Sequence, residues 1–284
     1  AGRSLLNLAN ERNEPIPVFA EMGSVNPVII LPEILKTDWT NLATKYANSI
    51  TLGSGQFCTN PGIIIGIKSD YFTHFVNSLA EKILDIAPSC MLHPNILSNY
   101  NKNKQELISD KKVNVVANFD EDVEVNYSKQ TLAKVKGSDF IINNDLQEEI
   151  FGPFSLLVEC DNMSQLKSVV NKINGQLTGT IIASNNEISS NKDLIDILKE
   201  RVGRIIFNGV PTGVEVNASM LHGGPYPAST DSRFTAVGVK SIDRWVRPLS
   251  YQDFPNELLP DSLQDNNPKN ILRLVNGIYT KNKI

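Results

Sequence analysis

Short apolar runs alternate with longer amphipathic stretches as far as about residue 209. Runs rich in β-branched residues predict strands, and apolar positions three and four residues apart predict helices. Strands are predicted at residues 17–21, 27–31, 62–67, 113–119, 154–160, 178–184 and 203–209, with a weaker candidate at 131–137. Helices are predicted at residues 39–49, 71–84, 95–109, 163–173 and 191–202. This alternation predicts βαβ units and an α/β fold, an open, largely parallel twisted sheet flanked by helices.

Glycine- and proline-rich sequence marks where these elements stop. Gly175 follows the helix at 163–173, and we expect it to close that helix in the left-handed conformation. Residues 209–234 are rich in Gly, Pro, Ser and Thr, which predicts a long ordered loop at the rim of an active site. The tail from Leu249 is rich in Pro and Asn, and its apolar residues suit packing on a neighbouring domain or subunit.

Composition and charge exclude several classes of protein. The 284 residues are 41% hydrophobic and 20% charged, which is enough apolar material for a buried core. The net charge is −4, whereas nucleic-acid binders usually carry an excess of basic residues, so we expect no nucleic-acid partner. No run of about 18 consecutive apolar residues occurs, so we expect no membrane partner. The three cysteines have no C-x-x-C spacing, which favours a reducing, cytoplasmic setting. The three histidines are scattered along the chain, so we expect no metal site.

Cys58 is the cysteine whose surroundings favour catalysis. It lies in the segment TLGSGQFCTNPG, where Gly53 and Gly55 let the backbone approach a substrate closely. A nucleophilic cysteine needs partial exposure, thiolate character and nearby N–H donors, which a loop at the end of an element supplies. A buried, inert thiol is the alternative. The segment GSGQFC is no dinucleotide loop, because Cys58 replaces the third glycine and a helix precedes it.

Two acidic segments carry further candidates. Glu21 ends the run FAE before a glycine, where a poorly solvated cleft would suit it to general-base catalysis. A solvent-facing strand end is the alternative. Glu148 and Glu149 precede IFGP, and one of them can accept hydrogen bonds from sugar hydroxyls with the Phe151 ring beside a planar cofactor. A solvated turn is the alternative there.

In this order, the segments EMG, GQFCT and EEIFGP resemble the aldehyde dehydrogenase superfamily. Cys58 follows Glu21 by 58 − 21 = 37 positions, and Glu149 follows Cys58 by 149 − 58 = 91. The segments GRIIFNG and HGGPYP resemble the family's closing segments, so the resemblance covers essentially the whole chain. SGQFCTNPG and HGGPYPASTDSRFTAVG are most similar to the branch that oxidises 2-oxoglutarate semialdehyde (2,5-dioxovalerate), close to NADP-dependent fatty aldehyde dehydrogenases. One departure is EMGSV, where the family more often has E-L-G-G-K.

The resemblance implies an NAD(P)-dependent oxidoreductase that converts an aldehyde to a carboxylic acid. Cys58 would attack the aldehyde carbon, its backbone N–H would stabilise the oxyanion, and hydride transfer to NAD or NADP would leave a thioester. Glu21 would activate water to hydrolyse that thioester. Glu149 would hold the nicotinamide-ribose hydroxyls, and Phe151 would pack near the nicotinamide.

Three further residues are candidates around the substrate. Asn208 is a candidate supporting residue before the rim loop, and His222 and Arg233 lie within that loop. Arg233 can bind a substrate carboxylate with two hydrogen bonds, with an ordinary surface arginine as the alternative.

The resemblance also implies how the chain is divided. Residues 1–15 correspond to the end of the cofactor-binding domain, residues 16–218 to the catalytic domain, and residues 219–284 to a crossing loop with an oligomerisation and packing segment. The chain opens AGRSLLNLANER without Met and as if within a helix, so we expect most of the cofactor-binding domain to precede it. We expect a homodimer or homotetramer for the intact enzyme, and little turnover from this chain alone.

Two alternatives come from other classes. The chain can be a catalytically silent folded half that serves as a structural or interface module. Equally slow labelling of all three cysteines would support that interpretation. Alternatively, Cys58 and His222 can form the pair of a thiol hydrolase, although no acid near His222 in the sequence would orient it.

Overall fold

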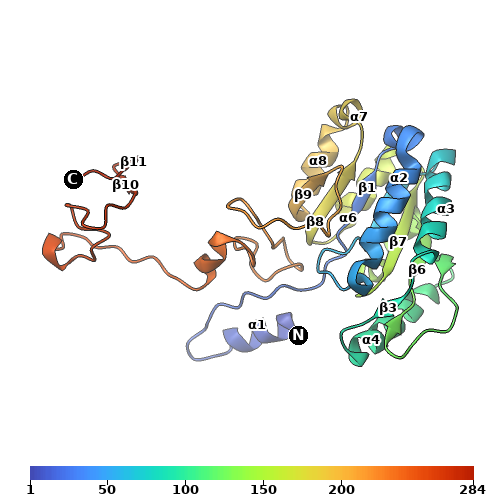
Figure 1. Ribbon diagram of the computed structural model, residues 1–284, viewed down its shortest axis with the longest axis horizontal. Coiled ribbons are helices and arrows are strands. Elements are labelled where there is room, and N and C mark those ends of the chain that lie inside the picture. Colours follow the sequence, from blue (N-terminus) through green and yellow to red (C-terminus); the bar gives the residue numbers. More distant parts are fainter. The chain divides into compact units, whose positions relative to one another are not determined.

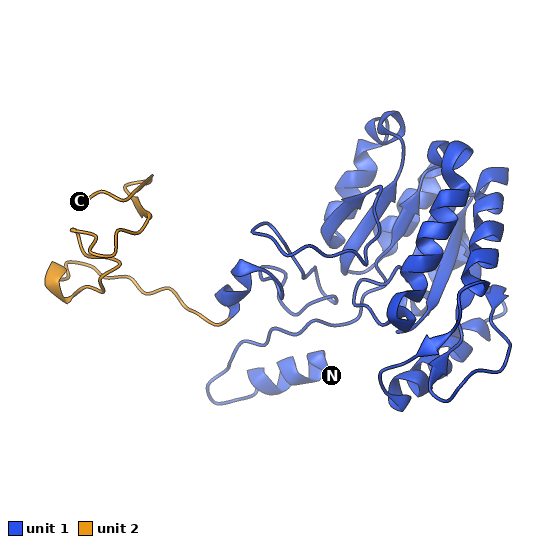
Figure 2. Cartoon of the chain, viewed as in Figure 1, with its two compact units in different colours: residues 1–244 blue, residues 245–284 orange.

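A seven-stranded sheet organises the first of the chain's two compact units, residues 1–244 (Figures 1 and 2). The computed structural model describes residues 1–284. In chain order the strands are β1 (Val28–Ile30), β2 (Ile63–Ile67), β4 (Asn114–Asn118), β6 (Thr131–Lys136), β7 (Phe154–Cys160), β8 (Gln176–Ile182) and β9 (Val202–Phe207). Their order in the sheet is β4-β6-β7-β2-β1-β8-β9, and every neighbouring pair is parallel except β4 with β6. The predicted α/β fold with a largely parallel sheet is confirmed.

Five helices of this unit correspond to the predicted ones with shifted ends, whereas the helices at residues 137–142 and 185–189 were not predicted. They are α1 (Gly2–Asn10), α2 (Pro32–Thr51), α3 (Asp70–Leu84), α4 (Pro94–Ile108), α5 (Gly137–Ile142), α6 (Met163–Lys172), α7 (Asn185–Ser189) and α8 (Lys192–Lys199). Helix α2 begins seven residues before the predicted residue 39, because Pro32 is at its first turn and its fixed φ suits that position. A short antiparallel pair, β3 (Ser89–Cys90) with β5 (Tyr127–Ser128), was not predicted.

Alternation along the buried strands divides the core into two layers. Ile63 and Ile65 of β2 belong to one buried cluster and Ile64 to the other, since successive side chains of a strand point to opposite faces. The cluster with Ile64 includes the apolar faces of α2 and α3, which lie together over one face of the sheet (Figure 1). The other cluster includes residues of α5, α6 and α8. Because both faces are covered, the strands are continuous apolar runs.

The predicted strand at residues 17–21 is wrong. Only Glu21 makes a bridge, an isolated one with Ser229, and the neighbouring backbone pairs with the rim loop. The Met22 N–H donates to the Ala228 carbonyl at 2.8 Å, and the Thr230 N–H donates to the Ala20 carbonyl at 3.0 Å. The segment is extended because it pairs with a loop some 200 residues away, outside the sheet.

The predicted role of Gly175 as a helix cap is also wrong. Helix α6 ends at Lys172, Ile173 is already extended, and Gly175 has no positive φ. A Cβ at Gly175 would lie 2.1 Å from the Pro225 carbonyl oxygen, so the rim loop packs directly on its backbone. Glycine is needed here for a close approach between distant segments.

The parallel arrangement brings the candidate residues to one edge of the sheet. Residues 21–26 precede β1, Cys58 precedes β2, and residues 148–151 precede β7. Since these strands are parallel, the segments before them meet at the edge where the strands begin. Open α/β sheets usually bind ligands at the opposite edge, where the strands end.

Residues 245–284 form the second unit. Its hairpin joins β10 (Arg273–Val275) to β11 (Ile278–Thr280) through Asn276 and Gly277, both with positive φ. The Asn-Gly pair is the strongest local hairpin signal, and the sequence interpretation overlooked it. Many apolar side chains of this unit are exposed, including Trp245 at 70%. No helix anywhere in the chain has both the length and the apolar character to span a membrane.

We expect Gly66→Ala to lower the free energy of unfolding by about 1–3 kcal/mol, the usual cost of overpacking a core. A Cβ at Gly66 would lie 2.2 Å from the buried Phe72 ring of α3. Gly213→Ala is the control, because the nearest atom to its Cβ is the Val210 carbonyl oxygen at 3.8 Å. Urea unfolding measures both variants, and equal stability would contradict tight packing of β2 on α3.

Candidate active site

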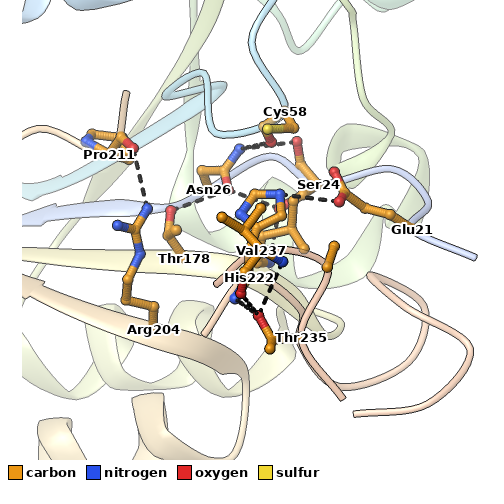
Figure 3. A network of polar contacts seen from close by, with 12 residues as sticks. Glu21, Ser24, Asn26, Cys58, Thr178, Arg204, Pro211, His222, Thr235 and Val237 are labelled. Carbon is orange, nitrogen blue, oxygen red and sulfur yellow. Dashed lines mark hydrogen bonds and ion pairs between the residues drawn. The ribbon is translucent and has the colours of Figure 1, made fainter. Parts of the chain in front are cut away.

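Asn26, just before β1, is a buried amide that joins the candidate loops (Figure 3). Its Nδ2 donates to the carbonyl oxygens of Cys58 and Asn60, each at 2.9 Å. Its Oδ1 accepts from the hydroxyls of Ser24 at 2.9 Å and Thr178 at 3.1 Å. Its φ of 46° lies in the left-handed region, which Asn tolerates better than most residues. Both ends of the amide are therefore satisfied, and the loop after Glu21 is fixed to the loop of Cys58.

Gln176, the first residue of β8, is a second buried amide in the same network. Its Oε1 accepts from the Val25 N–H at 2.6 Å and the Ser24 hydroxyl at 3.0 Å. The Ser24 hydroxyl in turn accepts from the Leu177 N–H at 3.0 Å. The segment that carries Glu21 is thus anchored to β8, a strand that is buried along its whole length.

Left-handed backbone leads the chain from α2 to Cys58. Gly53, Ser54 and Gly55 have φ values of 55°, 59° and 66°. The sharp turn agrees with the expectation for the two glycines, and the Ser54 hydroxyl hydrogen-bonds the Ser89 hydroxyl at 2.6 Å. A Cβ at Gly55 would lie 2.2 Å from the Gly152 carbonyl, so GQFCT and EEIFGP contact each other through their backbones. Cys58 itself is half-buried.

Three of the candidate side chains converge at this loop. The His222 Nε2 lies 3.0 Å from the Glu21 Oε2. The Cys58 sulfur, a Glu21 oxygen and a His222 nitrogen all lie within 4.8 Å of one another. His222 is 6% exposed, and its backbone N–H donates to the Thr235 hydroxyl at 2.8 Å within the rim loop. The structure therefore brings together Cys58, Glu21 and His222, and it supplies the acid beside His222 that the sequence does not reveal.

The environment of His222 favours its charged form. A hydrogen bond with Cys58, and then one with Glu21, raises the pKa of His222 to about 9, although burial acts in the opposite direction. His222 is therefore an imidazolium ion at neutral pH. A positive charge beside a cysteine favours the nucleophilic thiolate.

The same three residues are a possible cation-binding set. In tetrahedral Zn²⁺ sites, with bonds of about 2.0–2.3 Å, ligand atoms lie about 3.5 Å apart. A spread of up to 4.8 Å is looser than that. Since a metal needs a neutral imidazole, the raised pKa of His222 also opposes binding at neutral pH.

Glu149 lies against the backbone that follows Glu21. A Cβ at Gly23 would lie 3.2 Å from the Glu149 Oε2. Burial first, and then the charge of Glu21, raises the pKa of Glu149 to about 7, while a hydrogen bond from the Ser24 backbone acts against this. Phe151 is half-buried and lines the same hollow as Glu149. Glu148, by contrast, is exposed.

A cavity of about 500 Å³ opens on the other side of Glu149. It is lined by five carboxylates and no lysine or arginine. Such a wall repels the pyrophosphate of a dinucleotide.

The remaining candidates lie away from the three converging side chains. The Asn208 Oδ1 accepts from the Ala183 N–H at 2.9 Å and its Nδ2 donates to the Ala183 carbonyl at 3.0 Å, at the edge where the strands end. Arg233 donates to both carboxylate oxygens of Asp231, at 2.9 and 2.6 Å, and its side chain is 79% exposed.

Sequence reasoning missed the residues that hold the site in place. Asn26 carries one usable signal, since Asn-Pro directly before an apolar run marks a turn. Gln176 also carries one, as a glutamine at the start of a buried strand needs a partner. Nothing local indicates Thr178 or Arg204, because their importance depends on their neighbours across the sheet.

The chain is similar to known proteins over most of its length. The sequence matches the aldehyde dehydrogenase family over residues 1–235. It is 42% identical over 282 residues to an alpha-ketoglutaric semialdehyde dehydrogenase of Acinetobacter baylyi, covering 99% of this chain and 54% of that protein. It is 36% identical over 276 residues to alpha-ketoglutaric semialdehyde dehydrogenase 2 of Azospirillum brasilense, covering 97% and 53%. The chain thus spans about half the length of the curated relatives it matches.

A solved structure shares the fold. An indole-3-acetaldehyde dehydrogenase in complex with NAD⁺ superposes with a TM-score of 0.70 at 18% identity. The match covers 86% of this chain and 48% of that one. At this level of identity the likeness concerns the fold alone.

We expect the imidazole of His222 to titrate with a midpoint at about 9 in an NMR pH series, with His222→Asn assigning the signal. Glu21→Gln should lower the midpoint, because one hydrogen-bond partner loses its charge. The folded state keeps this proton above pH 6.5 and the unfolded state does not. The free energy of unfolding should therefore fall as pH rises from about 6.5 to about 9. A midpoint near 6.5 would contradict the arrangement.

Proposed function

Because the chain belongs to the aldehyde dehydrogenase family, we propose that it is the catalytic part of an enzyme that oxidises an aldehyde to a carboxylic acid with NAD or NADP. The observation that carries the proposal is the convergence of Cys58, Glu21 and His222 within 4.8 Å. A thiol, a carboxylate and a protonated imidazole together provide a nucleophile, a base and a charge that stabilises the nucleophile.

Cys58 performs the covalent step. Its sulfur forms a bond to the aldehyde carbon, and the carbonyl oxygen becomes an oxyanion that accepts a hydrogen bond from the Cys58 backbone N–H. A bound nicotinamide cofactor would supply the hydride acceptor, and a thioester would then remain on Cys58. The loop is held for this step by Asn26, whose amide donates to the Cys58 carbonyl at 2.9 Å.

Glu21 and His222 divide the proton chemistry. One carboxylate oxygen of Glu21 pairs with His222 at 3.0 Å, which leaves the other free to accept a proton from water. That water hydrolyses the thioester and releases the carboxylic acid. His222 holds a positive charge beside the Cys58 sulfur while it is a thiolate. The same three side chains suit a thiol hydrolase, but the family match favours aldehyde oxidation, in which hydrolysis is the second half of the reaction.

Glu149 and Phe151 are the cofactor-binding residues of this proposal. The Glu149 carboxylate would accept hydrogen bonds from the nicotinamide ribose, and the Phe151 ring would pack beside the nicotinamide. Both residues lie before β7, at the edge of the sheet that holds Cys58, which supports this. The curated relatives are about twice as long, so we expect this chain alone to bind cofactor poorly and turn over little.

The substrate we propose is 2-oxoglutarate semialdehyde. Both curated relatives are named for it, at 42% and 36% identity. In this proposal residues 1–15 end the cofactor-binding domain, residues 16–218 form the catalytic domain, and residues 219–284 form the crossing and oligomerisation segment. The intact assembly is a homodimer or homotetramer. The exposed apolar side chains of residues 245–284 support a packing role for the tail.

Cys58 should react with iodoacetamide about tenfold faster than Cys90 at pH 7.5, since thiolate character rather than exposure controls the rate. Cys90 is exposed and Cys160 buried, so both are internal controls. His222→Asn should slow labelling of Cys58 and leave Cys90 unchanged. Mass spectrometry of the labelled peptides measures all three rates. Slower reaction at Cys58 than at Cys90 would favour the silent structural module instead.

A further inference from the structure

Arg204 lies on the face of the sheet that carries the Cys58 network. It is the third residue of β9 and pairs in parallel register with Thr178 of β8. The Thr178 hydroxyl donates to the Asn26 Oδ1, and the Asn26 amide donates to the Cys58 carbonyl. Register partners on neighbouring strands point to the same face. Arg204 therefore lies beside Thr178 at the margin of the network, as Figure 3 shows.

Most hydrogen-bonding capacity of this guanidinium is unused. Its terminal nitrogens donate to the Pro211 carbonyl at 3.4 Å and the Gly213 carbonyl at 3.5 Å, longer than ordinary N–H···O bonds of about 2.7–3.2 Å. Its Nε is buried and has no acceptor. No aspartate or glutamate of the chain pairs with it, whereas Arg233 is already bound by Asp231. A guanidinium has five N–H donors, so Arg204 retains room for an anion.

The positive charge of Arg204 interacts electrostatically with Cys58. Burial lowers the pKa of Arg204, and the negative charge of a Cys58 thiolate acts in the opposite direction. Arginine stays protonated at any physiological pH. The site therefore has a fixed positive charge within electrostatic reach of the Cys58 sulfur.

We propose that Arg204 binds the carboxylate of an aldehyde acid while Cys58 bonds to its aldehyde carbon. This assignment rests on the proposed function. It names the residue that holds the carboxylate at the far end of the aldehyde substrate. A planar guanidinium binds a carboxylate through two parallel hydrogen bonds, which fixes both the position and the orientation of the substrate. An uncharged aldehyde of the same length lacks this anchor.

Reversible addition of aldehydes to Cys58 tests the assignment without a cofactor. The addition forms a carbon–sulfur bond, and the thiol proton passes to the carbonyl oxygen, so no oxidant is required. The probes are 5-oxopentanoate and pentanal, which have equal chain lengths and differ in the carboxylate. The measurement is the concentration of each that halves the rate of Cys58 alkylation by iodoacetamide.

We expect 5-oxopentanoate to protect Cys58 at about a tenfold lower concentration than pentanal. Arg204→Met should abolish the preference for 5-oxopentanoate. Arg204→Lys should keep part of it, because lysine retains the positive charge but cannot form two parallel hydrogen bonds to a carboxylate. Arg201→Met is the matched control. The Nε of Arg201 also lacks an acceptor, but its guanidinium donates to Asn171 of α6 at 2.8 Å. The Arg201→Met variant should retain the full preference for 5-oxopentanoate.

Each contrary outcome has a distinct meaning. Equal protection by the two aldehydes in the wild-type chain overturns the role of Arg204 and leaves the proposed function standing. A preference that survives Arg204→Met but is lost in Arg233→Met assigns the anchor to the rim loop instead. Protection by neither aldehyde overturns the proposed function together with this assignment. The wild-type comparison needs no variant, so a folding defect in Arg204→Met leaves the proposal falsifiable.

Discussion

A buried amide at the start of β1 is the constraint on which the site depends. The Asn26 side-chain amide donates to the carbonyls of Cys58 and Asn60 and accepts from the hydroxyls of Ser24 and Thr178. The backbone of Asn26 itself has a φ of 46°. Each buried polar group left without its partner costs about 1–3 kcal/mol, so the network favours a single arrangement of its loops. These hydrogen bonds hold the turn that carries Cys58, which lies outside any strand, against the rigid parallel sheet.

The charges of the site balance around that fixed point. Glu21 and His222 lie within 4.8 Å of the Cys58 sulfur, and Arg204 interacts with Cys58 electrostatically. Burial raises the pKa of Glu149 to about 7, so about half of this carboxyl group is neutral at pH 7. Hydrogen bonds with Cys58 and with Glu21 raise the pKa of His222 and keep it protonated. A low effective dielectric makes each of these interactions stronger than it would be in water. The positive charge of His222 beside Cys58 is balanced by the carboxylate of Glu21.

Local patterns predicted the elements of the sheet, because β-branched runs and helical periodicity are properties of neighbouring residues. Motif order predicted that Glu21, Cys58 and Glu149 belong to one site, and the parallel strands bring the segments before them to a common edge. What failed depends on distant partners: residues 17–21 pair with a loop 200 positions away, and Gly175 accommodates Pro225. The contact of Glu21 with His222 has no local signal at all. The Asn-Gly hairpin of the tail did have one and was overlooked.

The lifetime of an acyl group on Cys58 tests the central claim most directly. An activated acyl ester can acylate the thiol without cofactor, and mass spectrometry then follows the loss of the acyl group with time. The account predicts that Glu21→Gln lengthens this lifetime by about 10²-fold or more, the usual contribution of a general base. An unchanged lifetime in Glu21→Gln would contradict the account, and acylation at Cys90 in place of Cys58 would do the same.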